Sequence, residues 1–103
     1  MATYWLSFTL DSRTVGNQDY SARWDALYND IRSISNNWWT DTTAFIVFET
    51  TQSLSQVVAV AKKAVSPTYD TVLIRTMDAK NATIFGPVTD EDIFKMMPYL
   101  ARG

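Results

Sequence analysis

The spacing of apolar residues in this chain alternates between the period of a β-strand and the period of an α-helix, and this alternation is the strongest constraint on its fold. Residues 3–11 alternate apolar and polar side chains, which is the period of a half-buried strand. Between residues 20 and 35 the apolar side chains recur every three or four positions, which predicts a helix with Asp19 or Ser21 as its N-cap. The apolar stripe of that helix consists of Tyr20, Trp24, Leu27, Ile31 and Ile34.

The remainder of the chain continues the same alternation. Ser53 and Gln56 match a capping box, so a second helix should begin there and end before Pro67. The acidic run Asp90-Glu91-Asp92 is typical of the N-terminus of a C-terminal helix, where negative charge is stabilised. The further predicted strands cover residues 38–39, 44–50, 71–77 and 83–85.

The resulting order, β-α-β-β-α-β followed by a short strand and a helix, predicts an α+β fold. The expected architecture is a ferredoxin-like βαββαβ sandwich, a four-stranded antiparallel sheet with two helices on one face. We expect the first and third strands to be central and parallel. Residues 1–103 should form one domain. Residues 79–103 form an extension that is too apolar for a free tail, and we expect it to pack on the sheet or on a dimer partner.

The composition narrows the chemistry. The chain has no His and no Cys, which excludes imidazole bases, thiolate nucleophiles and metals held by either side chain. A net charge of −2 with scattered Lys and Arg does not support a duplex-binding face, although a dimer could gather those charges into one groove. The apolar runs are far shorter than the roughly 20 residues of a membrane span. We therefore expect a cytoplasmic protein without membrane contact or cofactor.

Several short motifs carry a family resemblance. They are Tyr4-Trp5-Leu6-Ser7-Phe8-Thr9-Leu10, Asp19-Tyr20 at a helix start, Trp38-Trp39, and Thr43-Ala44-Phe45-Ile46-Val47 before a helix that begins with Ser. Over residues 3–76 this pattern resembles the small SinR-family proteins, which are distant relatives of the small CRISPR-associated adaptation nuclease and of VapD-type toxin ribonucleases. The resemblance implies a ferredoxin-like fold, a homodimer and metal-dependent phosphodiester chemistry.

The chain departs from that family at the metal ligand. In the nuclease relatives an Asp follows the aromatic residue near the end of the first strand, whereas the matching pair here is Phe8-Thr9. A Thr hydroxyl is neutral and cannot replace a carboxylate as the ligand of a hard cation. Asp11 lies two residues further on, about 6–7 Å along an extended strand, and could serve only if the site has moved.

Two kinds of candidate site follow from the predicted topology. We expect Asp11, Glu49 and Asp70 to share one rim of the sheet, where they could hold Mg²⁺; the alternative is that they are solvated strand ends and turn formers. Large aromatic side chains indicate an interface with another protein chain, although the adjacent Trp38 and Trp39 could also stack on nucleic-acid bases. The candidate interface residues are Trp5, Trp38, Trp39, Phe85 and Phe94.

Three functions remain open at this point. The favoured one is a non-catalytic, dimeric interaction module that has kept the nuclease-like fold. Nucleic acid is one candidate partner, although the net negative charge and the scattered Lys and Arg do not support it. The second is a weak Mg²⁺-dependent endonuclease or ribonuclease that uses Asp11. The third is a dimeric regulatory domain that senses a small molecule.

Overall fold

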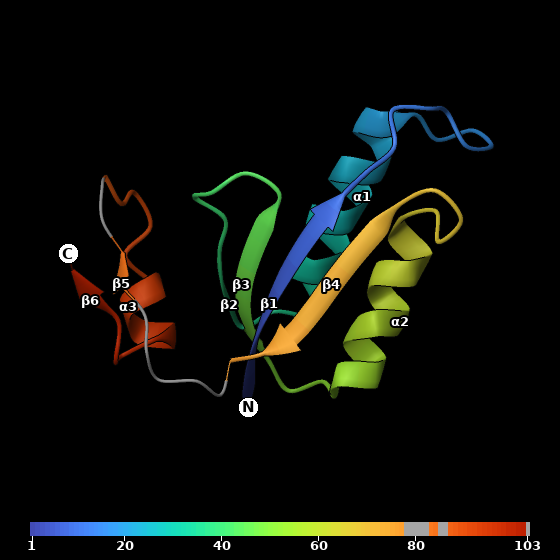
Figure 1. Cartoon of the computed structure of the whole chain (residues 1–103). Helices are drawn as coiled ribbons and strands as arrows, with labels where there is room; N and C mark the ends of the chain where they lie inside the picture. Colours follow the sequence, from blue (N-terminus) through green and yellow to red (C-terminus); the bar gives the residue numbers. More distant parts are fainter. Residues whose placement is uncertain (78–82, 85–86, 103) are drawn as a thin grey trace.

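The computed structural model describes residues 1–77, 83–84 and 87–102. Their secondary structure follows the order predicted from the hydrophobic period as far as the last helix, and a two-residue strand at residues 101–102 was not predicted (Figure 1). The elements are β1 (Ala2–Thr9), α1 (Tyr20–Ser33), β2 (Asn37–Trp39), β3 (Phe45–Thr50), α2 (Leu54–Ala64), β4 (Thr71–Thr76), β5 (Thr83–Ile84), α3 (Ile93–Met96) and β6 (Ala101–Arg102).

The first four strands form one antiparallel sheet in the order β2-β3-β1-β4, and α1 and α2 lie together on one of its faces (Figure 1). This α+β arrangement is compatible with a ferredoxin-like fold. The prediction that the two central strands are parallel was wrong, because β1 and β3 pair antiparallel. The chain returns through α1, so β2 runs in the same direction as β1. The turn between β2 and β3 then reverses the direction, so β3 runs antiparallel to β1.

The helix-facing side of the sheet holds the main core. The alternating residues of β1, the inward residues of β3 and the stripes of both helices are buried together. In α1, Leu27 and Ile31 are fully buried as predicted, whereas Tyr20 at the start of the same stripe is 42% exposed. Arg23 takes a buried position on this helix instead, at 1% exposure. A charged residue inside an apolar stripe therefore has a specific partner, which is described below.

Local sequence signals set the helix ends. The Asp19 side chain accepts a hydrogen bond from the amide of Ala22, which makes it the N-cap of α1. Ser53 and Gln56 form the predicted capping box at the start of α2. Helix α2 ends at Ala64, just before the Ser-Pro step that disfavours helical geometry.

The opposite face of the sheet carries a second, smaller cluster. Side chains of α3 and its flanks pack against Trp39 of β2 and Val47 of β3, and Figure 1 shows this C-terminal segment beside those two strands. The aspartate at the β2–β3 turn, Asp41, accepts hydrogen bonds from the amides of Thr89 and Asp90, both at 2.9 Å. The C-terminal segment is thus attached through one carboxylate as well as through apolar contacts.

None of the helices in the described part of the chain combines the length and apolar character that a bilayer crossing requires.

Candidate functional site

Two of the three predicted residues, Asp11 and Asp70, do lie close together, at the rim where β1 ends and β4 begins. Asp11 follows β1, and Asp70 immediately precedes β4. The amide of Asp11 donates a hydrogen bond of 2.9 Å to Oδ1 of Asp70. The buried Arg23 of α1 enters the same rim and forms an ion pair with Asp70, with 2.9 Å between Nε and Oδ2.

Arg23 uses its guanidinium group to hold the surrounding loop. Besides the contacts to Asp70, Nη1 donates to the carbonyl oxygens of Arg13 and Gln18, and Nη2 donates to that of Asp11 at 2.6 Å. The fork of five N–H donors is therefore fully used. These bonds tie the long β1–α1 loop to the helix that follows it, so the group acts as a structural clamp.

Asp70 is equally occupied. It accepts bonds from the amides of Asp11 and Ser66 and from Arg23, and its side chain is entirely buried. Burial acts to raise the pKa of Asp70, but these hydrogen bonds and the Arg23 charge outweigh it and hold the pKa below its ordinary value. The carboxylate thus stays ionised, and both of its oxygens already accept hydrogen bonds within the chain.

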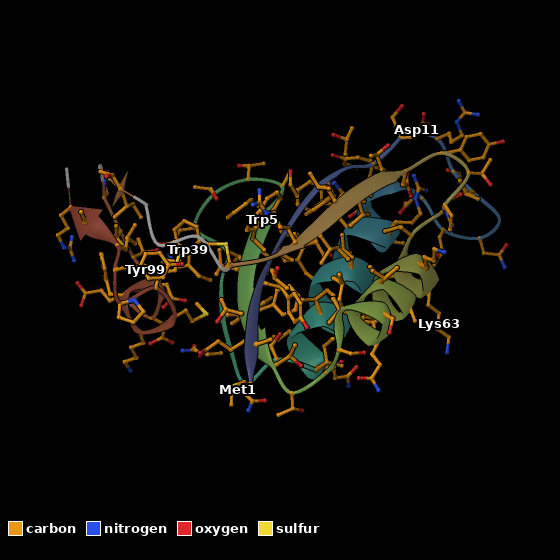
Figure 2. All side chains as sticks on the ribbon, turned by 60° about the horizontal axis from the view of Figure 1, so that its bottom comes forward. Met1, Trp5, Asp11, Trp39, Lys63 and Tyr99 are labelled. Carbon is orange, nitrogen blue, oxygen red and sulfur yellow. The ribbon has the colours of Figure 1, made fainter. Side chains whose placement is uncertain are left out.

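Asp11 is the more open of the pair. Its Oδ1 accepts bonds from both the side chain and the amide of Arg13, and these bonds lower the pKa of Asp11. The guanidinium of Arg13 in turn lies 4.0 Å from the ring centre of Tyr69. Figure 2 shows Asp11 at the outer end of the sheet, away from the C-terminal segment. The side chain could accept a cation only by giving up its contacts with Arg13.

The third carboxylate is elsewhere. Glu49 pairs with Thr3 near the start of β1, at the opposite end of the sheet from Asp11. The expectation that Asp11, Glu49 and Asp70 share a rim was therefore wrong for Glu49, and the cause is the antiparallel direction of β3. Among the residues that the structure describes, no group of three His, Cys, Asp or Glu side chains gathers as a metal site.

The aromatic candidates divide between the two faces. Trp38 lies on the helix side, with the guanidinium of Arg32 5.0 Å from its ring centre. Trp39 faces the other way and is only 5% exposed. Trp5 stacks on Phe45 with 5.8 Å between ring centres, at the border of the cluster that includes Phe94. Phe85 lies outside the described residues.

These rings already have neighbours within the chain. Trp39 and Tyr99 lie near each other at the C-terminal segment in Figure 2, and both belong to the smaller cluster. A shallow, open apolar hollow of about 230 Å³ lies between this segment and the sheet, and Trp39 and Phe45 contribute to its wall. Trp39 consequently offers little surface to a partner.

A second hollow, of about 370 Å³, runs along the free edge of the sheet between α2 and β4. It is lined largely by apolar residues, of which Leu54 is 41% exposed. Leu73 also borders it, but the side chain of Leu73, 57% exposed, alternates with Val72 and Ile74 and lies on the other face of the sheet. Lys62 lies at the margin of the hollow. The sequence reasoning missed this groove, although the unbroken apolar and β-branched sequence of β4, bounded by no charge until Arg75, was the available signal.

Comparison with protein-family models, with curated proteins and with solved structures finds no match for this chain.

Proposed function

We propose that this chain is a non-catalytic interaction module that works as a homodimer. The observation that carries the proposal is the exposed apolar surface along the free edge of β4: the groove between α2 and β4, where Leu54 is exposed, and Leu73, which is exposed on the other face of the same strand. Exposed apolar surface of this kind marks a site of association, because leaving it in water is unfavourable. A twofold dimer is the commonest assembly that would cover it.

The carboxylates support a role without catalysis. Asp70 is committed to Arg23 and to two backbone amides, and Asp11 is committed to Arg13. A hard cation needs several free oxygen ligands, and water activation in a nuclease depends on that cation. Thr9, at the position of the family ligand, adds only a neutral hydroxyl.

The finer details of the fold belong to the same proposal. We take the domain to be a ferredoxin-like βαββαβ sandwich of the kind found in the SinR-like and CRISPR-associated nuclease families, with residues 79–103 as an extension. The strand order β2-β3-β1-β4 and the placement of both helices on one face support this assignment.

Two measurements test the proposed function. Light scattering of the full chain at micromolar concentration should give twice the 11.7 kDa mass of one chain. Incubation with single- or double-stranded RNA or DNA and Mg²⁺ or Mn²⁺ should give no cleavage. A monomer would contradict the dimer. Cleavage that is lost in Asp11→Asn would replace the proposal with a metal-dependent nuclease that uses Asp11.

A further inference from the structure

The two edges of the sheet differ in how well they are protected. The edge strand β2 has three residues and lies beside α3. The opposite edge strand, β4, has six residues, Thr71–Thr76, with no Pro or Lys and a single charge at Arg75. Natural edge strands are usually shortened, charged, bulged or covered, because a bare edge pairs with other chains. Apart from Arg75, β4 has none of these protections within the described part of the chain, and it is suited to accept another strand.

The direction of the free backbone groups of β4 follows from its pairing with β1. The amide of Met77 donates to the carbonyl of Thr3 at 2.9 Å, one step beyond the registered pair Tyr4–Thr76. Bonded and non-bonded pairs alternate along an antiparallel ladder, so Arg75 and Leu73 also bond inward to β1. Val72, Ile74 and Thr76 therefore direct their N–H and C=O groups outward, and these groups must be the ones that a further strand meets.

We propose that this further strand is β4 of a second copy of the chain, paired antiparallel about a twofold axis at Leu73. The inference rests on the proposed function and specifies the surface that the dimer uses. Val72 of one copy then opposes Ile74 of the other as a hydrogen-bonded pair, and the same pair recurs on the other side of the axis. The two Leu73 residues face each other as a close, non-bonded pair, about 4.5 Å apart between Cα atoms. The two sheets become one continuous sheet.

This register fits the side chains better than its neighbour. Residues whose backbone N–H and C=O groups point outward must pair with residues of the same kind in the second copy. The twofold axis can therefore pass through Leu73 or through a position such as Ile74. An axis at Ile74 would place the exposed Leu73 opposite Arg75. An axis at Leu73 covers the two leucines with each other, and it sets each Arg75 opposite Thr71 of the second copy, so the arginines remain apart.

The groove beside β4 supplies the rest of the interface. Antiparallel pairing brings the two α2 helices to the same side of the joined sheet, and the apolar grooves that contain Leu54 meet over the Val72 and Ile74 pairs. The Lys62-Lys63 pair sits near the C-terminal end of α2, where Figure 2 labels Lys63, so the twofold axis places the two lysine pairs at opposite ends. A stable interface needs more than ~1,000 Å² in total, and strand and groove must both contribute to reach it.

Cross-linking tests the register directly, because the natural chain has no cysteine. Leu73→Cys should form a disulfide-linked dimer as the main product on mild oxidation, since close antiparallel pairs lie within disulfide reach. Thr9→Cys is the matched control: it is exposed on the same sheet face but one strand in from the edge. It should stay uncross-linked under the same conditions. Equal cross-linking of both variants would overturn the proposed register.

A charge variant tests the surface. Leu73→Lys removes an exposed side chain, so the chain should keep its fold, and its mass by light scattering should fall by half. Thr9→Lys should keep the dimer mass. If the natural chain is dimeric but Leu73→Lys remains dimeric and Leu73→Cys does not cross-link, the β4 surface is refuted while the dimer stands. If the natural chain is monomeric, the proposed function itself fails.

Discussion

Removing the carboxylate of Asp70 should destabilise the protein more than most single changes at polar positions. In Asp70→Ala the guanidinium of Arg23 stays buried at 1% exposure without its counter-charge, and the amides of Asp11 and Ser66 lose their acceptor. Breaking a buried ion pair by removing one partner costs about 3–5 kcal/mol. A small domain has only about 5–15 kcal/mol of unfolding free energy, so a large share would be lost.

Urea denaturation followed by tryptophan fluorescence measures this loss. Asp11→Ala is the control, because its ion pair with Arg13 is exposed and screened by solvent and should contribute little to stability. A second variant, Arg23→Met/Asp70→Leu, replaces both charges with apolar groups and should recover part of the stability, because no charge is then left unpaired. If Asp70→Ala costs no more than the Asp11→Ala control, the clamp does not hold this rim together, and the argument from burial is wrong.

Four further outcomes are expected. Leu27→Ala should lower the unfolding free energy by about 2–5 kcal/mol in the same urea assay, because Leu27 is fully buried in the core; a loss near zero would misplace the α1 stripe. Ser53→Ala should cost about 1 kcal/mol through loss of the capping box, while Ser55→Ala beside it should cost less. The lowered pKa of Asp70 gives stability that is complete above its unfolded value of about 3.9 and is lost as pH falls through the folded pKa; the acid unfolding of Asp70→Asn should accordingly be shallower than that of the natural chain. Asp41→Ala should let trypsin cut faster at Lys95, because the carboxylate that holds the amides of the C-terminal segment is gone; unchanged cleavage would show that apolar contacts suffice.

Much of the local structure could be predicted from the sequence, because short-range physics controls it. The alternating residues of β1 had to face one side of a sheet, and the Asp19 and Ser53 caps marked where the helices begin. The absence of His and Cys from the sequence also excluded imidazole bases and thiolate nucleophiles, whatever the geometry of the fold. Each of these conclusions depends on residues within a few positions of one another, or on composition alone.

The candidate sites depended on tertiary structure. Asp11, Arg23 and Asp70 are far apart in sequence. Only the folded rim shows that the Asp70 carboxylate and the backbone carbonyl of Asp11 both accept from one buried guanidinium, while the Asp11 carboxylate pairs with Arg13. The one local sign was Arg23 itself, a charge four residues before Leu27 on the buried side of a helix. Glu49 was misplaced because strand direction is set by the connections around it, not by the residues within it.

The same division applies to the two edges of the sheet. The sequence by itself determined that residues 71–76 form an apolar, β-branched strand, since side-chain pattern and propensity act locally. The expected sheet, with the first and third strands central, already placed this strand at an edge. Only the tertiary structure decided that a groove lies beside it and that Leu73 is exposed, because those features depend on contacts between residues that no local pattern connects.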